Sequence, residues 1–264
     1  MTARGLGMLA LLLLALPVSA LEPAPEGLSA REVARRAEDN LRSDRTYFEA
    51  RMTIESPRLS SARSVRFKSW EDRGAKRSFI RIHEPAKDVG TGFLKLGSNL
   101  WMYIPRVERT MRVPPSMMLQ SWMGSDFTND DLVKESSEID DYDHRWLGVE
   151  PAGEPAEARR AYVIEYLPHE DAPVVWGRIV AWIAVDGYAP LRQEFFDEDG
   201  EKLRELVFSD HRQVGSRLMP YRWSLTPLDK PGHRTEIELI ETKFDLEFDE
   251  TIFTRRYLEK EFRR

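Results

Sequence analysis

The chain has 264 residues, a formal net charge of −6 and no cysteine. The acidic balance argues against nucleic-acid binding, which requires a basic surface. The lack of cysteine excludes disulfides, cysteine-ligated metals, a thiol nucleophile and a lipid-anchored N-terminal cysteine. Charged residues make up 32% of the chain and are of both signs along its length, which is typical of the solvated faces of a folded domain.

The first twenty residues are typical of a secretory signal peptide. Arg4 precedes an apolar run over residues 6–18, and the small residues Ser19 and Ala20 follow it. The run is too short to cross a bilayer comfortably, and no later segment approaches that length. We therefore expect residues 1–20 to be cleaved, and residues 21–264 to form one exported domain without a transmembrane span or lipid anchor.

The next elements in the chain are a helix and a series of strands. Residues 28–41 predict an amphipathic helix, with Ser29 and Glu32 as a capping box. The segments after it have alternating or apolar patterns at the short spacing of an antiparallel meander. These strands are expected at residues 46–55, 65–70, 77–83 and 89–96.

The stretch 99–122 predicts a hairpin followed by a helix. The strand at 99–104 is apolar on both faces, since Trp101 and Tyr103 alternate with Leu100, Met102 and Ile104. After a turn at Pro105, a second strand covers 107–113, and a helix is expected over 116–123. This pattern allows either an ordinary core corner or the wall and lid of a cavity, and the methionines of this stretch favour adaptable apolar surfaces.

A short helix is expected near residues 127–133, with Asp126 or Thr128 close to its cap. The acidic residues between 126 and 143 do not have the spacing of a calcium loop. Helix starts and solvated faces explain most of them without a metal ion.

The second half of the chain repeats the strand pattern and ends in a helix. Strands are expected at residues 159–167, 177–185, 190–197, 203–214, 218–226 and 234–244, followed by a closing helix at 253–262. The total of about ten or eleven strands predicts a mainly β protein with one large sheet. No sequence period indicates a propeller or solenoid.

The sequence contains no recognisable catalytic motif. Its five histidines are scattered and have no metal-ligand spacing. The serines near glycine lack the nucleophile-elbow pattern of hydrolases. We expect no enzyme activity, no catalytic residue, no metal and no cofactor.

Several segments together carry a resemblance to a known family. They lie at residues 91–93 (TGF), 100–105 (LWMYIP), 124–132 (GSDFTNDDL), 182–191 (WIAVDGYAPL), 196–203 (FDEDGEKL) and 248–254 (FDETIFT). The hairpin at 100–105 resembles that of the periplasmic lipoprotein carriers LolA and LolB, and the other segments are similar to the branch called outer-membrane lipoprotein-sorting protein. The likeness runs over nearly the whole mature chain.

This resemblance implies an incomplete antiparallel β-barrel of about eleven strands, with helices covering the open side and an apolar cavity for acyl chains. Trp101 and Tyr103 would face that cavity or the helical cover. The residues expected to line the cavity and its lid are Phe93, Leu94, Leu96, Trp101, Tyr103, Met111, Met118, Leu119, Trp122, Met123, Phe127 and Trp182.

The function implied is that of a periplasmic carrier of lipoprotein or other lipid acyl chains. Its expected partners are the acyl chains and an inner-membrane transporter or an outer-membrane acceptor. The alternative is a non-enzymatic lipid-sensing accessory or regulatory protein of an envelope transporter. Transfer of bound lipid to acceptor vesicles would distinguish the carrier from the sensor.

Overall fold

The computed structural model describes residues 22–260 except 24, 134–137, 154–157 and 173. The expected signal peptide at 1–20 lies outside the described residues. No helix in the described part of the chain is both long and apolar enough to span a membrane.

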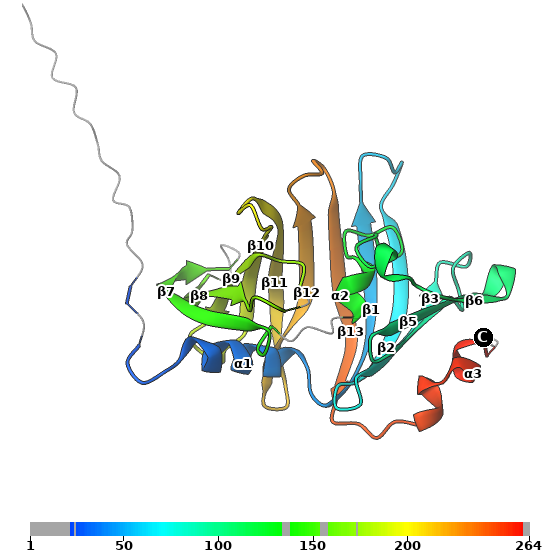
Figure 1. The fold of residues 1–264 in the computed structure, drawn as a ribbon, viewed down its shortest axis with the longest axis horizontal. Helices are drawn as coiled ribbons and strands as arrows, with labels where there is room; N and C mark the ends of the chain where they lie inside the picture. The colour runs from blue at the N-terminus through cyan, green and yellow to red at the C-terminus, as the bar shows by residue number, and fades with distance from the viewer. Residues whose placement is uncertain (1–21, 24, 134–137, 154–157, 173, 261–264) are drawn as a thin grey trace, which may run out of the picture.

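Thirteen antiparallel strands of the described chain form one sheet, in the order β6-β5-β4-β3-β2-β1-β13-β12-β11-β10-β9-β8-β7 (Figure 1). The strands are β1 (Arg45–Glu55), β2 (Arg63–Asp72), β3 (Arg77–Glu84), β4 (Gly92–Leu96), β5 (Asn99–Ile104), β6 (Arg109–Arg112), β7 (Tyr142–Ala152), β8 (Arg159–Pro168), β9 (Arg178–Ala184), β10 (Pro190–Phe196), β11 (Lys202–Val214), β12 (Arg217–Pro227) and β13 (Arg234–Phe244). Neighbours in the sheet are also neighbours in the chain, except that β1 pairs with β13. The edges are therefore β6 and β7.

The expected fold class is confirmed: the protein is mainly β, and its sheet curves without closing into a barrel. The strand that the sequence pattern misses is β7. Its residues include Asp143, Gly148 and Pro151, which have low β propensity. As an edge strand it needs fewer apolar side chains than a central strand does, so its periodicity is weak.

The helix α1 (Ala30–Leu41) covers part of one face of the sheet, which we call the inner face. It packs against β7, β9 and β12, and its buried side chains include Ala30, Val33 and Ala37. The predicted N-cap is confirmed, since Ser29 Oγ accepts a hydrogen bond from Glu32 N at 3.1 Å. The cap gives a hydrogen-bond acceptor to one of the otherwise unpaired amides of the first turn.

Replacing this cap serine is expected to have a small, measurable effect. Ser29→Ala should lower the free energy of unfolding by about 1 kcal/mol, because one helix amide loses its acceptor. Urea denaturation would measure the difference. Ser60→Ala, at the exposed tip between β1 and β2, is the matched control, and an equal effect of both changes would contradict the role of the cap.

The helix predicted over residues 116–123 is wrong. The structure has only the 3₁₀ turn η2 (Pro115–Met117) there. The following amides pair across a tight loop instead, with Trp122 N donating to Phe127 O at 2.8 Å and Asn129 N to Gln120 O at 3.0 Å. Met123 then adopts a φ of 51°, which a right-handed helix does not allow.

The remaining helices are short. Of the two residues expected near the cap of helix α2 (Asn129–Val133), Asp126 and Thr128, it is Thr128 whose Oγ1 accepts from Asp131 N, at 3.2 Å. The expected closing helix at 253–262 is instead the 3₁₀ turn η4 (Glu250–Phe253) followed by the four-residue α3 (Arg255–Leu258). Positions 261 and 262 lie outside the described residues. Another 3₁₀ turn, η1 (Pro105–Val107), joins β5 to β6 at the predicted Pro105 turn.

Candidate functional site

The inner face of the sheet carries two apolar clusters, and residues 113–131, which we call the plug, cover one of them. The first cluster lies beneath α1 and includes Ile164, Ile183 and Phe195. The second, the Trp122 cluster, combines Trp122 of the plug with buried side chains of β1–β5, β12 and β13. In Figure 1, α2 at the end of the plug lies in front of β13 and β1.

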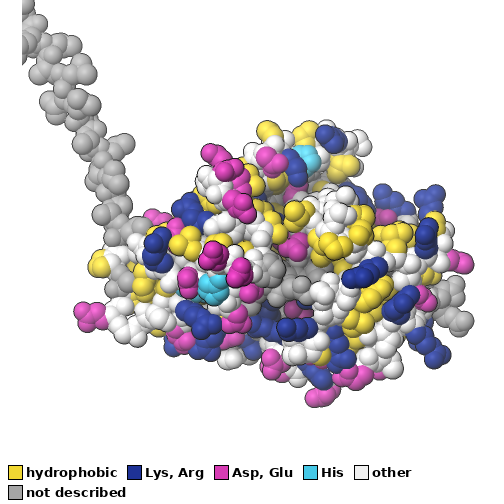
Figure 2. Space-filling view, viewed as in Figure 1, with side chains coloured by type: hydrophobic (Ala, Val, Ile, Leu, Met, Phe, Trp, Pro, Cys, Tyr) yellow, Lys and Arg dark blue, Asp and Glu magenta, His cyan; other side chains and the backbone are white. Residues whose placement is uncertain are grey.

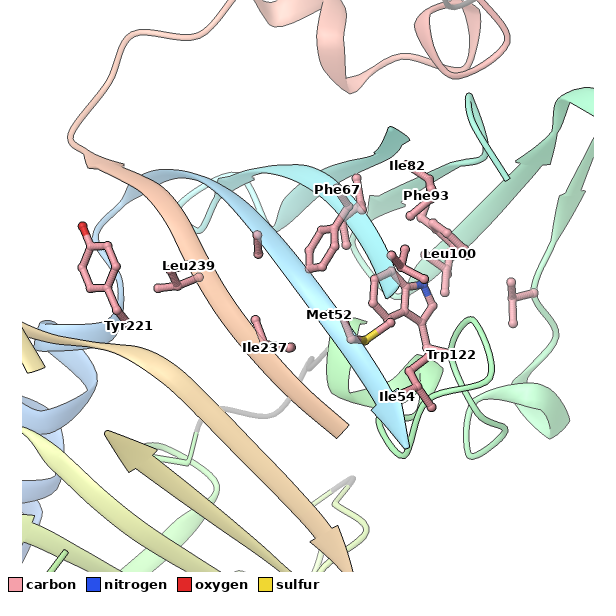
Figure 3. Close-up of a cluster of buried hydrophobic side chains, with 14 of the residues drawn as sticks. Met52, Ile54, Phe67, Ile82, Phe93, Leu100, Trp122, Tyr221, Ile237 and Leu239 are labelled. Atoms are coloured by element: carbon pink, nitrogen blue, oxygen red, sulfur yellow. The ribbon is translucent and has the colours of Figure 1, made fainter. Parts of the chain in front are cut away.

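Trp122 is the largest side chain that the plug inserts. Its indole is 1% exposed and meets Phe67 and Phe93 edge to face, with ring centroids 5.2 and 5.7 Å away. Figure 3 shows the indole directed between β1–β2 and β4–β5, beside Met52 and Leu100. Such aromatic pairs add about 0.5–1.5 kcal/mol each to the burial of their area. The plug therefore occupies apolar space that the sheet would otherwise present to solvent.

The indole nitrogen of this ring has no acceptor among the described residues. This nitrogen, Trp122 Nε1, is buried. A buried donor without an acceptor costs about 1–3 kcal/mol. The seated plug is thus less stable than its apolar contacts alone would make it.

Polar side chains from the sheet hold the plug at three positions. Arg63 of β2 donates from Nη1 to Met123 O at 2.6 Å and from Nη2 to Asp88 at 2.7 Å. At the second position, Thr235 Oγ1 of β13 donates to Asp126 Oδ2 at 2.7 Å and accepts from Asp126 N at 3.0 Å. The plug is fastened along its C-terminal half.

His233 supports the second position, because its Nδ1 lies 3.3 Å from Asp126 Oδ1 and its Nε2 lies 3.0 Å from Ser56 Oγ. This imidazole connects the tip of the β1–β2 hairpin to the plug. Both contacts join residues more than 100 positions apart in the chain.

The third position is an ion pair of low exposure. Arg204 of β11 donates to both oxygens of Asp131 at 2.8 and 2.9 Å, and the two side chains are 9% and 12% exposed. The guanidinium also lies over Trp176 and Phe195, 4.3 and 4.5 Å from their ring centroids. Bidentate geometry and aromatic stacking both fix the orientation of an arginine. This pair links α2 to the half of the sheet that α1 covers.

Five of the sequence-predicted cavity residues come together on the inner face. Phe93 and Trp122 are buried in the Trp122 cluster, and Met118, Met123 and Phe127 are partly buried against it. Two more of the predicted residues, Met111 and Leu119, lie nearby but are not part of this cluster. Met111 of β6 pairs with Met102, which packs on the same cluster, while Leu119 points to solvent and is 61% exposed.

The other predicted residues lie on the outer face, opposite the plug. Leu94 is buried there against Phe253 and Leu258, and Leu96, Trp101 and Tyr103 pack around them. The segment 245–260 covers these side chains, so the second apolar side of β5 is matched by the C-terminal part of the chain. Trp182 is also on the outer face, where it donates from Nε1 to Glu150 at 2.6 Å and stacks under Arg192. The twelve residues are therefore not gathered in one place.

The residues that fasten the plug were not found from the sequence. Arg204 could have been, because it shares the inward side of β11 with Leu206 and Phe208, where a charge is unexpected. Thr235 likewise precedes the inward-facing Ile237 and Leu239 on β13. A polar residue in register with an apolar face predicts a buried partner. Which residue is that partner can be determined only once the fold is known.

The arrangement offers apolar packing and few chemical groups. Asp126 and Asp131, two of the acidic residues between 126 and 143, hold the plug. Within the described residues, no group of three or more His, Asp or Glu side chains is placed to bind a metal ion. The site is an apolar surface of the sheet covered by the plug.

Comparison with known proteins identifies a family for the chain. Residues 74–260 match the model of a protein family described as "Uncharacterized protein". The chain belongs to this family. No curated protein matches the chain.

Solved structures share its LolA-like fold. An outer membrane lipoprotein-sorting protein domain from Vibrio parahaemolyticus has 23% identity and a TM-score of 0.72, over 88% of this chain and 98% of that one. A DUF1329 family protein from Desulfovibrio piger has 22% identity and a TM-score of 0.76, over 87% and 97%. A LolA superfamily protein from Nitrosomonas europaea has 20% identity and a TM-score of 0.70, over 87% and 99%.

The LolA-like fold is an open, incomplete barrel, which agrees with a sheet whose edges β6 and β7 do not pair. In this chain the plug follows β6 and packs on the inner face as far as Arg204 of β11. Its outer surface carries apolar side chains, including Leu119 and Met117 at 61% and 37% exposure. Figure 2 shows hydrophobic side chains on this face, between side chains of both charges.

Proposed function

We propose that this protein is a periplasmic carrier that shields acyl chains of a lipoprotein or another lipid on its inner face. It would pass this cargo between membranes or to an envelope transporter. Residues 1–20 would direct export, and residues 21–264 would form the single carrier domain. The observation that carries the proposal is the plug, which covers apolar sheet with Trp122 and is held by polar contacts.

The energies of plug and cargo are compatible with exchange. Removing a buried aromatic side chain from a core costs about 3–5 kcal/mol. Burial of one methylene group recovers about 0.8 kcal/mol, so about five methylenes offset that cost. The polar contacts that hold the plug add to this cost, so a longer acyl chain is needed to leave a net favourable free energy. The unpartnered Trp122 Nε1 lowers the cost of opening further.

The direct test is to identify what the protein carries. Protein purified from its native envelope should contain acyl lipid, detected by native mass spectrometry and by lipid extraction. Incubation with acceptor vesicles should move that lipid into the vesicles. Purified protein without lipid, which also fails to bind the fluorescent fatty acid dansylaminoundecanoic acid, would overturn the proposal. Lipid binding without transfer to vesicles would favour the sensor.

A disulfide between plug and sheet should block uptake. In the double variant Asp126→Cys/Thr235→Cys the new thiols replace side chains that are in hydrogen-bond contact, and the chain has no other cysteine. Oxidation is expected to weaken binding of dansylaminoundecanoic acid at least about tenfold, because the plug-open state is removed from the ensemble. Reduction should restore binding.

The single variant Thr235→Cys under the same oxidant is the control for this experiment. It loses one tether contact but cannot lock the plug. Unchanged binding by the oxidised double variant, with the disulfide verified by mass spectrometry, would show that cargo does not need the plug to move.

A further inference from the structure

The outer face of the sheet contains a charged cavity of about 420 Å³. It lies across β1, β2 and β3 and is walled by the connection from β3 to β4. Its lining residues are Glu49, Arg66, Lys68, His83, Glu84, Ala86 and Val89. Since Glu49 precedes the inward-facing Ala50 on β1, the cavity is on the opposite side of the sheet from the Trp122 cluster. It is separate from the proposed carrier site.

Irregular pairing of the strands shapes this cavity. Arg66 pairs with Glu84 but Phe67 pairs with Ile82, so His83 is an extra residue in β3. On the other side, Glu49 pairs with Glu241 but Ala50 pairs with Leu239, so Ile240 is an extra residue in β13. Bulges of this kind redirect side chains and are frequent next to functional sites. Two of them flank β1 and β2 at this position.

The cavity presents both signs of charge at close range. Glu49 is only 7% exposed. Its Oε1 accepts a hydrogen bond from Arg66 Nε at 2.6 Å. Arg66 also lies 3.4 Å from Glu84. The ammonium of Lys68 is 3.8 Å from Glu49, which is longer than a hydrogen bond and leaves it able to approach a ligand. Two cations on β2 are thus flanked by carboxylates on β1 and β3.

The remaining lining side chains add no net charge. Burial is the main cause that lowers the pKa of His83, and Lys68, Arg66 and Arg81 lower it further, against the opposing effect of Glu49. The imidazole is therefore neutral at pH 7. The side chains of Ala86 and Val89 form an apolar wall. The two carboxylates balance the two cations, so the cavity carries no net charge, and a ligand of single charge would leave the occupied cavity with an uncompensated charge.

We propose that this cavity binds a small zwitterion, with its ammonium group at Glu49 and Glu84, its anionic group at Arg66 and Lys68, and its short aliphatic spacer against Ala86 and Val89. The cavity volume is at the lower end of the range for small-molecule sites, about 300–1,000 Å³. An ammonium phosphodiester such as glycerophosphoethanolamine has this chemistry, with one charge of each sign at pH 7. It occurs free and as a lipid head group.

The test is isothermal titration of residues 21–264 with glycerophosphoethanolamine at pH 7. Binding is expected for this zwitterion, and at least about tenfold weaker binding for ethanolamine or inorganic phosphate alone, because each satisfies only one sign of charge. No binding of the zwitterion, or equal binding of either half, would overturn the proposal.

Variants connect this binding to the cavity. Lys68→Gln should weaken it at least about tenfold, whereas Lys68→Arg should retain it. Lys243→Gln removes a lysine that is half exposed on β13 and pairs with Glu241 outside the cavity, so it should change nothing. Circular dichroism would verify that each variant is folded. Equal affinities of Lys68→Gln and Lys243→Gln would overturn the assignment to this cavity.

Competition distinguishes the two sources of the ligand. If vesicles that contain phosphatidylethanolamine displace bound glycerophosphoethanolamine, the site takes the lipid head group. If they do not, the site takes the free zwitterion. Phosphatidylglycerol vesicles, which lack the ammonium group, should not compete in either case, and displacement by them would contradict a site for zwitterions.

Discussion

Trp122→Ala is expected to lower the free energy of unfolding by about 3–5 kcal/mol and to tighten the binding of acyl chains. The loss of stability follows from removing a fully buried aromatic side chain from a packed cluster. The gain in binding follows because cargo no longer has to displace the indole from the inner face. An increase of about tenfold in affinity would correspond to about 1.4 kcal/mol of that displacement cost.

Urea denaturation and titration with dansylaminoundecanoic acid measure the two effects separately. Trp101→Ala is the matched control, since Trp101 is a tryptophan of neighbouring β5 that packs on the outer face. It should reduce stability without changing affinity for the fatty acid. If both variants bind the probe as the unchanged protein does, Trp122 does not compete with cargo.

Asp131→Asn is expected to cost about 3 kcal/mol of stability and to loosen the plug. The substitution removes the carboxylate that pairs with the Arg204 guanidinium, which lies over the rings of Trp176 and Phe195. Breaking one side of a buried ion pair typically costs 3–5 kcal/mol, and the partial exposure of this pair places it at the lower end. Hydrogen exchange of residues 113–131 should accelerate more than exchange of the central strands.

The comparison for this change is Asp186→Asn, which breaks the ion pair between Asp186 and Arg159. Asp186 is 75% exposed there, so its loss should cost well under 1 kcal/mol. Faster exchange throughout the protein, rather than in the plug, would mean that the Arg204 pair stabilises the fold as a whole and does not act as a local fastening.

Alternation in the sequence was sufficient to predict most of the sheet. β1 shows why: Phe48, Ala50, Met52 and Ile54 form one side, and each packs on the inner face. The cap at Ser29 could also be predicted, because capping depends on residues three positions apart. In both cases the interactions that decide the structure are local or repeat with a short period.

The plug and the orientation of β5 could not be predicted in this way. Residues 118–122 have helical spacing, but main-chain hydrogen bonds to residues 127–130 outweigh it. On β5, both sides are apolar, so alternation alone does not predict which side faces the inner face of the sheet. Trp101 and Tyr103 turn outward because Phe253 and Leu258, about 150 residues later, cover that side. These choices depend on pairings distant in sequence.

The pairing of β1 with β13 also has a consequence for how the chain reaches this structure. Every other ladder in the described sheet joins consecutive strands, whereas this one joins opposite ends of the domain. Loop-closure entropy delays contacts between such distant segments. Two separate meanders would therefore form first, each with an exposed apolar face. A holdase chaperone would bind these faces before β1 and β13 pair.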